Sequence, residues 1–289
     1  MENLLEKYQF ELTSQTIDTE LNEVRGNLQL MMTAENYAKS LGFIDLTSLH
    51  STDTTEKITR LVKKVNYFNA HFPEYPLPAS ICVYPNFAKT IKDVLSVSGV
   101  DITTVAACFP TAQSFLNVKE LECKCAVEDG ANEIDIVLAL NAFMNGNYDY
   151  ASEEIKGIRE TIGNNMLKVI LETGALVSIE NIATASFLAM EAGADFIKTS
   201  TGKMEPAATP MAAIVMCKCI KAYYEKTGRK VGFKAAGGIR TPEDAITYLA
   251  ITQSILGREW ATPKLFRLGA SGLANNLLSV LKGETVSYF

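Results

Sequence analysis

The sequence of 289 residues is poor in the side chains that most metal sites and acid–base sites use. It has two histidines, His50 and His71, and its six cysteines form no C-x-x-C pair. Both C-x-C pairs lie in predicted helices, where side chains two positions apart point in different directions. We therefore predict reduced thiols, no metal site and little room for histidine-based acid–base chemistry.

The chain also lacks an excess of positive charge and any long apolar run. Its 27 Lys and Arg face 33 Asp and Glu, and the net charge of -6 argues against a nucleic-acid partner. No apolar segment reaches the length needed to span a bilayer, and acidic residues stand where a secretory signal would be basic. We expect a cytoplasmic protein without a membrane partner. An anionic small molecule stays compatible with this charge, because a local site can oppose the global sign.

Short β-rich runs alternate with helical stretches from about residue 42 onward, which is typical of βα units that build a parallel sheet. Eight strands in one domain of this length predict an α/β fold, a single (β/α)₈ TIM barrel whose active site lies at the carboxyl ends of the strands. The predicted strands span 43–46, 80–84, 103–108, 133–138, 167–172, 195–199, 231–235 and 266–270.

The residues before the first strand form a predicted N-terminal helical extension over 1–40, and the barrel catalytic domain spans 41–289. Apolar positions in the extension, such as Leu4, Tyr8 and Leu28, predict packing across a barrel end or against another subunit. We assign this extension no chemistry.

Two lysines stand at the ends of apolar strands. Lys198 ends the run 194–198 and Lys234 ends the run 231–234, and each is followed by small residues that let a backbone approach a ligand. A lone strand lysine usually faces solvent or extends past its neighbours to reach water. Two ammonium groups held together away from water disfavour each other's charge, so at least one amine should be partly neutral near pH 7. A neutral lysine amine is a nucleophile toward carbonyls.

Asp135 is the acidic residue that we expect beside these lysines. It alternates with Ile134 and Ile136, so the carboxylate points into the barrel if the two isoleucines pack on the helices. The strand ends of a closed barrel meet at one mouth, so Asp135 lies near both lysines and is a candidate proton carrier. The alternative is a strand-end aspartate that caps a nearby amide.

Three glycine-rich strand ends predict an anion site. Backbone N–H groups exposed by glycine at a helix start bind anions, and barrels often hold phosphate after strands seven and eight. Together with Lys203 and Arg240 they indicate a phosphorylated substrate, although each cation could instead pair with a surface acid. The three segments are Thr201-Gly202-Lys203, Gly237-Gly238-Ile239-Arg240 and Gly269-Ala270-Ser271-Gly272.

With these residues in place, the chain resembles deoxyribose-phosphate aldolase from about Phe43 to Ser271. The resemblance implies a metal-independent and cofactor-free Schiff-base aldolase that interconverts 2-deoxy-D-ribose 5-phosphate with acetaldehyde and D-glyceraldehyde 3-phosphate. The matching blocks are Phe43-Ile44-Asp45-Leu46-Thr47, Ile81-Cys82-Val83-Tyr84-Pro85, Asp129-Gly130-Ala131-Asn132-Glu133-Ile134-Asp135, Phe196-Ile197-Lys198-Thr199-Ser200-Thr201-Gly202-Lys203, Gly232-Phe233-Lys234 with Gly237-Gly238-Ile239-Arg240, and Phe266-Arg267-Leu268-Gly269-Ala270-Ser271.

Roles follow from the resemblance position by position. It implies that Lys198 forms the Schiff base, that Lys234 lowers the pKa of Lys198, and that Asp135 is the acid that works with water in proton transfer. Relatives are often dimers, so the resemblance also implies a possible homodimer. The positions that it implies for contacts with substrate hydroxyls or phosphate are Asp45, Thr201, Lys203, Gly237, Gly238 and Ser271.

The chain departs from the family pattern at several positions. Gly272 stands where relatives commonly carry a hydroxyl residue beside the phosphate, and one lost hydrogen bond costs about 1.5 to 3 kcal/mol of binding. Ala235 replaces a frequent proline. The chain ends in Tyr288-Phe289, whereas bacterial relatives often finish on tyrosine. The family pattern therefore does not assign Tyr288 a role in closing over the substrate.

Two rival hypotheses remain at this point. Another Schiff-base barrel aldolase would keep an imine lysine but use different proton carriers. A non-catalytic barrel that binds sugar phosphates would bind the ligand without turnover, and it would need neither Lys198 nor Lys234.

Overall fold

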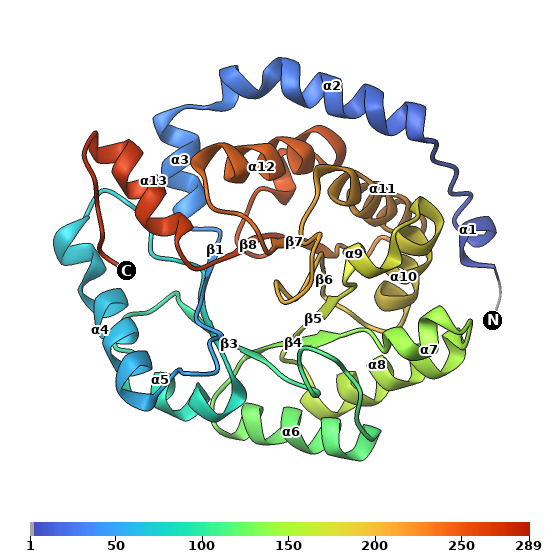
Figure 1. Ribbon diagram of the computed structural model, residues 1–289, viewed down its shortest axis with the longest axis horizontal. Helices are drawn as coiled ribbons and strands as arrows, with labels where there is room; N and C mark the ends of the chain where they lie inside the picture. The colour runs from blue at the N-terminus through green and yellow to red at the C-terminus, as the bar shows by residue number, and fades with distance from the viewer. Residues whose placement is uncertain (1–2) are drawn as a thin grey trace.

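The computed structural model describes residues 3–289, and its eight strands close into a parallel barrel in chain order (Figure 1). Each strand pairs with the next one, and β8 pairs with β1, so the predicted fold class is confirmed. The strands are β1 Ile44–Thr47, β2 Ser80–Val83, β3 Asp101–Val105, β4 Glu133–Val137, β5 Met166–Ile170, β6 Phe196–Lys198, β7 Gly232–Ala236 and β8 Phe266–Ala270.

Helices surround the barrel on its outside (Figure 1). Both C-x-C pairs lie on helices, as predicted, and the six cysteines are free thiols. Within residues 3–289, no helix combines the length and the apolar character needed to cross a bilayer. The helices of the barrel are α4 Thr55–His71, α5 Ala88–Val94, α6 Leu116–Glu128, α7 Leu140–Met144, α8 Tyr148–Ile162, α9 Thr173–Leu176, α10 Ile179–Glu191, α11 Pro210–Thr227, α12 Pro242–Leu256 and α13 Leu273–Lys282, with short 3₁₀ turns at Pro85–Phe87 and Arg258–Trp260.

Two strands end more than one residue earlier than predicted, because the backbone leaves the extended region. After β3, Ala107 and Cys108 have φ of 57° and 62°. After β5, Glu172 has φ of 55° and takes a left-handed conformation before α9 begins. An extended strand does not include residues with positive φ. The residue types Ala, Cys and Glu do not indicate a positive φ in the sequence.

The N-terminal extension consists of α1 Leu4–Lys7, α2 Ser14–Met31 and α3 Ala34–Leu41. α2 packs against α11 and α12 on the outside of the helix ring (Figure 1). The ring of Tyr8 stacks on Phe187 of α10, with ring centroids 4.3 Å apart. The expectation that this segment crosses a barrel end is therefore wrong, because its apolar side chains cover the flank of the barrel instead.

The barrel interior carries charge where apolar branched side chains usually dominate. Charged side chains from six of the strands are almost completely buried there, while their strand neighbours Ile134, Ile136, Val169, Ile197 and Phe233 pack in the surrounding core. Since an unpaired buried charge is costly, these charges must pair with one another. The buried charged residues are Asp45, Glu133, Asp135, Lys168, Lys198, Lys234 and Arg267.

Candidate active site

Lys198 and Lys234 lie side by side on neighbouring strands and share one carboxylate. The register of β6 and β7 pairs Lys198 with Lys234. Both Nζ atoms donate hydrogen bonds to Oδ2 of Asp135, each at 2.8 Å. The two nitrogens are thus no more than twice that distance apart. The predicted convergence of the three residues is confirmed.

Asp135 lies inside the barrel, as the strand alternation predicted. Ile134 and Ile136 pack in the core, while the Asp135 carboxylate is fully buried among cations. Burial by itself raises the pKa of Asp135, but the charges of Lys168, Lys198 and Lys234 outweigh it and hold the pKa well below its usual range. Asp135 is therefore an ionised carboxylate at neutral pH.

The two lysines differ in the direction of their pKa shifts. Burial lowers the pKa of Lys198, and the positive charge of Lys234 lowers it further against the pull of Asp135. Burial also lowers the pKa of Lys234, but Asp135 and Asp45 together outweigh it, and its pKa is raised. Lys198 is thus the amine that loses its proton more readily, while Lys234 stays charged.

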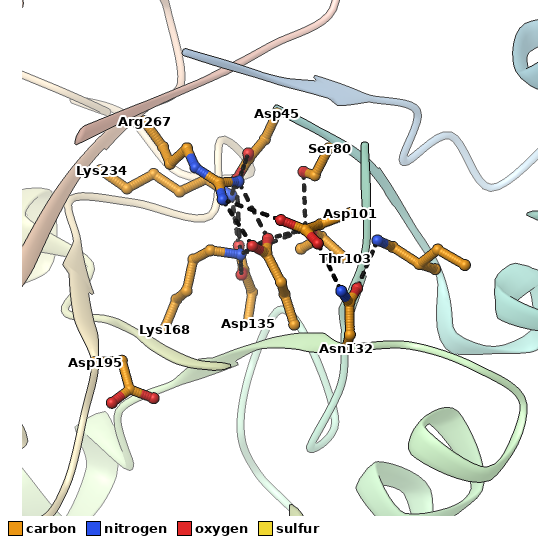
Figure 2. Close-up of polar contacts among 12 residues, drawn as sticks. Asp45, Ser80, Asp101, Thr103, Asn132, Asp135, Lys168, Asp195, Lys234 and Arg267 are labelled. Carbon is orange, nitrogen blue, oxygen red and sulfur yellow. Dashed lines mark hydrogen bonds and ion pairs between the residues drawn. The ribbon is translucent and has the colours of Figure 1, made fainter. Parts of the chain in front are cut away.

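Lys168, Arg267 and Glu133 complete the buried cluster, and the sequence analysis assigned them no role. Lys168 Nζ donates to Glu133 Oε2 at 2.6 Å and to Asp135 Oδ1 at 3.1 Å. Arg267 Nη2 donates to Glu133 Oε1 at 2.7 Å. Figure 2 shows Lys168, Lys234 and Arg267 converging on the carboxylates of Asp45 and Asp135. Lys168 follows Leu167 and precedes Val169, the same lysine-in-apolar-strand pattern that selected Lys198.

Asp45 belongs to this cluster and not to the surface of the cavity described below. It forms ion pairs with Lys234 and with Nη1 of Arg267, the latter at 2.5 Å. Burial raises the pKa of Asp45, but the charges of Lys234, Arg267 and Lys168 reverse this effect and lower it well below its usual range. A contact with substrate, which the resemblance implied, is not part of this geometry. Asp45 instead keeps Lys234 charged.

The charge balance of the cluster favours a neutral Lys198. Three buried carboxylates face four buried cations, because Asp45, Glu133 and Asp135 oppose three lysines and Arg267. When Lys198 gives up its proton, three negative charges remain beside three positive ones. A buried cluster with equal numbers of positive and negative charges has the smaller desolvation penalty. The cluster therefore favours the neutral amine of Lys198.

A cavity of about 220 Å³ opens above Lys198. Most of the predicted binding residues line this cavity. Asp135, Lys234 and Asp45 do not line it and are buried in the barrel. Thr47 at the end of β1, with Leu49 and His50 after it, also lines the cavity, and no sequence pattern indicated these residues. The predicted residues on its surface are Lys198, Thr201, Gly202, Lys203, Gly237, Gly238, Arg240, Gly269 and Ser271, together with Gly272.

Two glycine turns touch each other in the cavity wall. Gly202 and Gly237 have φ of 73° and 85°, a conformation that residues with a side chain rarely adopt. A Cβ atom on Gly237 would lie 2.6 Å from Cβ of Ala207 and 3.1 Å from Cα of Gly202. Only glycine fits here, so the backbones of these turns are open to a ligand.

The amino end of α13 is the best anion site on this wall. Ser271 and Gly272 line the cavity, and Gly272 caps α13 without any side-chain hydrogen bond to the helix. The nearby start of α12 differs, because Thr241 and Asp244 already cap it. The free N–H groups and the dipole of α13 therefore favour an anion beside Ser271. Nearby, Lys203 Nζ donates to the carbonyl of Leu49 at 2.6 Å.

Glu172 holds the Thr201 turn from below, and the sequence analysis missed it. It is buried, and its carboxylate accepts hydrogen bonds from the Thr201 amide, at 3.1 Å, and from the Thr201 hydroxyl. The same hydroxyl accepts a hydrogen bond from the amide of Lys203 at 3.0 Å. Glu172 thus fixes the turn that carries Thr201 and Lys203, through a left-handed backbone that no local pattern predicts.

The buried carboxylates predict a loss of stability in acid. The pKa values of Asp45, Glu133 and Asp135 are lower in the folded chain than in the unfolded one. Their contribution is complete above the unfolded pKa of about 4 and is lost as the pH falls toward the folded values. We expect the free energy of unfolding to decrease below about pH 5, by at most about 1.4 kcal/mol per pH unit for each carboxylate that takes up its proton only in the unfolded chain.

Denaturant unfolding at pH 7, 5, 4 and 3 measures this effect. Glu56→Gln is a matched control because Glu56 is exposed, with a side chain 79% accessible. It should leave the dependence on pH unchanged. A free energy of unfolding that stays constant from pH 6 to pH 3 would show that the buried carboxylates are not held ionised.

Comparisons with known proteins agree with this geometry. The model of the DeoC/LacD family aldolases matches residues 39–260. The deoxyribose-phosphate aldolase of Homo sapiens is 41% identical over 250 residues, which cover 83% of this chain and 78% of the relative. That of Bos taurus is 43% identical over 246 residues, which cover 81% and 77%.

A solved structure agrees at the level of the fold. The deoxyribose phosphate aldolase of Aeropyrum pernix superposes with a TM-score of 0.67 over 93% of this chain and 98% of its own, at 23% identity. The resemblance read from the motifs is thus confirmed across most of the chain. This chain belongs to the DeoC/LacD family of aldolases, which are lyases.

Proposed function

We propose that the protein cleaves 2-deoxy-D-ribose 5-phosphate reversibly to acetaldehyde and D-glyceraldehyde 3-phosphate. The observation that carries this proposal is the position of Lys198, an amine with a lowered pKa at the floor of a cavity whose far wall is an anion site. A substrate with an aldehyde at one end and a phosphate at the other matches both features. The relatives from Homo sapiens and Bos taurus are deoxyribose-phosphate aldolases by name.

The first step forms an imine. The lone pair of Lys198 Nζ attacks the C1 aldehyde of the open-chain sugar, and the adduct takes up one proton from solvent as it loses water, which gives a protonated C=N bond. Lys234 stays charged beside it and discourages protonation of the free amine. The positive charge of the protonated imine lies next to the Asp135 carboxylate, as the charge of a Lys198 ammonium would. The carboxylate that binds Lys198 therefore also stabilises the intermediate.

The imine then accepts the electrons of the carbon–carbon bond. The C3 hydroxyl loses its proton, the C2–C3 bond breaks, and its electron pair moves to the imine to give an enamine and glyceraldehyde 3-phosphate. Protonation of the enamine at C2 and hydrolysis of the imine release acetaldehyde and restore Lys198. We assign Asp135 to these proton transfers through water, as an ionised acceptor, because its pKa is held low.

The anion site orients the substrate. We assign the phosphate to the free N–H groups at the start of α13 and to the turns of Gly237 and Gly238, with Lys203 and Arg240 nearby. This favours a phosphorylated sugar over the substrates of other Schiff-base aldolases. A non-catalytic phosphate binder would not need a buried amine next to a second lysine.

The test is a coupled assay for acetaldehyde release, with chelator present, beside a trapping experiment. Acetaldehyde and borohydride should add an ethyl group to the peptide that contains Lys198, and mass spectrometry should locate it. Lys89 and Lys124 are exposed lysines outside the cavity that control for unspecific labelling. No adduct on Lys198, or no release of acetaldehyde from 2-deoxyribose 5-phosphate, would refute the proposal.

Glu172→Gln should weaken substrate binding more than turnover. A glutamine has one acceptor oxygen, so one of the two Thr201 donors loses its partner at a cost of about 1 to 3 kcal/mol. The Thr201 turn then loosens, and we expect KM to rise about tenfold with a smaller change in kcat. Steady-state kinetics measures this, with Glu180→Gln on α10 as the control. A fall in kcat at constant KM would contradict it.

Location and assembly belong to the same proposal. The cytoplasm suits an enzyme for a small sugar phosphate and free thiols. The homodimer stays a prediction, and the Aeropyrum pernix relative is described as a tetramer.

A further inference from the structure

A second cavity, of about 400 Å³, opens next to the first one. Thr47, His50, Ser271 and Gly272 line both cavities. These shared residues lie at the anion end of the first cavity, whereas Lys198 lines the first cavity alone. The two spaces therefore meet where the phosphate is expected and not where the imine forms.

Gly272 leaves the passage between the cavities open. A Cβ atom at this position would meet no atom within 4 Å. Its φ of -91° is one that other residues adopt, so the backbone does not require glycine here. The consequence of glycine at this position is space: the side chain that would stand between the phosphate and the second cavity is missing.

Three basic side chains line the second cavity. Lys57, Arg60 and Lys64 lie on one face of α4 and line it, and no acidic residue is among its lining side chains within residues 3–289. Lys57 pairs with Asp53 at 2.5 Å, and Arg60 pairs with the exposed Glu56 at 2.5 Å. An exposed ion pair such as Arg60 with Glu56 is weak and dissociates readily.

Lys64 adds a charge without a counter-ion. Its side chain has no ion-pair partner in the part of the chain that the structure describes, and its carbonyl accepts a hydrogen bond from the Tyr288 hydroxyl at 2.6 Å. An anion in this cavity would thus find one free cation in Lys64 and a second in Arg60, whose surface partner it can displace.

The remaining wall is already in place. Phe289 lines the cavity, stacks on Phe68 with ring centroids 5.6 Å apart, and donates its amide hydrogen to Oδ1 of Asn275 at 2.9 Å. Tyr288 packs against Phe68 and Phe72. The cavity is therefore preformed, and ligand entry needs no rearrangement of this segment.

We propose that the second cavity binds a further phosphoryl group attached to the 5-phosphate, so that the protein also cleaves sugars of the 2-deoxyribose 5-diphosphate class. The proposal rests on the proposed function and extends its substrate range. The chemistry is unchanged: Lys198 forms the imine, the C2–C3 bond breaks, and the phosphoanhydride bond stays intact. The product would be glyceraldehyde 3-diphosphate beside acetaldehyde.

The experiment compares kcat/KM for 2-deoxyribose 5-phosphate and 2-deoxyribose 5-diphosphate. Wild type should cleave the diphosphate within about tenfold of the monophosphate. The double variant Arg60→Ala/Lys64→Ala should lower kcat/KM for the diphosphate by at least about tenfold and leave the monophosphate within twofold. Lys63→Ala is the matched control, because Lys63 is exposed on the same helix but does not line the cavity.

Each outcome decides between the two proposals. The inference is wrong if wild type cleaves the monophosphate but is more than a hundredfold slower on the diphosphate. It is also wrong if the double variant lowers both substrates equally, or if Lys63→Ala has the same selective effect. A wild-type protein that cleaves neither sugar would instead refute the proposed function on which the inference rests.

Discussion

Replacing Lys198 by alanine should abolish acetaldehyde release, with a loss on the order of 10⁴- to 10⁶-fold in kcat. The reason is chemical: alanine has no amine to form the imine, and no other described lysine lines the floor of the cavity. The folded structure should survive, because Asp135 keeps its hydrogen bonds to Lys168 and Lys234. Coupled assays at high enzyme concentration measure the residual rate.

Lys198→Arg separates the nucleophile from its charge. Arginine keeps a cation beside Asp135 but stays protonated at any working pH, so it forms no imine. We expect a loss as large as that of the alanine variant, together with a lower thermal stability, because a permanent fourth cation exceeds the three buried carboxylates. Arginine restoring more than about 1% of the activity would mean that Lys198 acts only through its charge, and would overturn its assignment as the nucleophile.

The local pattern of the strands predicted much of the site, and particular residues show why. Alternation along Ile134-Asp135-Ile136 fixes which side of the sheet each side chain occupies, and this repeat of two is a property of the strand alone. The barrel topology then brings the ends of β4, β6 and β7 together. The position of Asp135 beside Lys198 and Lys234 thus follows from sequence and fold class.

The residues that were missed depend on partners that lie far away in the chain. Lys168 becomes informative only when the register places it opposite Asp135, and Arg267 only when it reaches Asp45 and Glu133. Taken alone, each is a cation in an apolar strand, which usually indicates a side chain that extends to water. The resemblance implied a substrate contact for Asp45, and the segment around Asp45 does not show its buried cation partners Lys234 and Arg267.

Backbone conformation was the other source of error. Glu172 supports the Thr201 turn because its own backbone is left-handed, and glutamate has no preference for that region. The early end of β3 has the same cause at Ala107 and Cys108. The surrounding tertiary structure imposes these conformations, so a single segment cannot indicate them.

Replacing Lys234 by leucine should move the pH dependence of the reaction to more alkaline values. The Lys234 ammonium contacts the same Asp135 oxygen as Lys198, and its positive charge lowers the pKa of Lys198. Leucine removes this repulsion and also leaves more of the Asp135 charge to Lys198. Both effects raise the pKa of Lys198, so less free amine is present at pH 7.

We expect Lys234→Leu to lower kcat/KM at pH 7 by about 10²-fold and to recover part of the loss as the pH is raised toward 10. Lys234→Arg is the matched variant, because it keeps the charge beside Asp135 and Asp45 and should keep the pH profile close to that of wild type. The profile of kcat/KM against pH and the rate of borohydride trapping at each pH measure the effect independently. A low rate with an unchanged profile would assign Lys234 to packing, because only a change in the proton affinity of Lys198 moves both curves together.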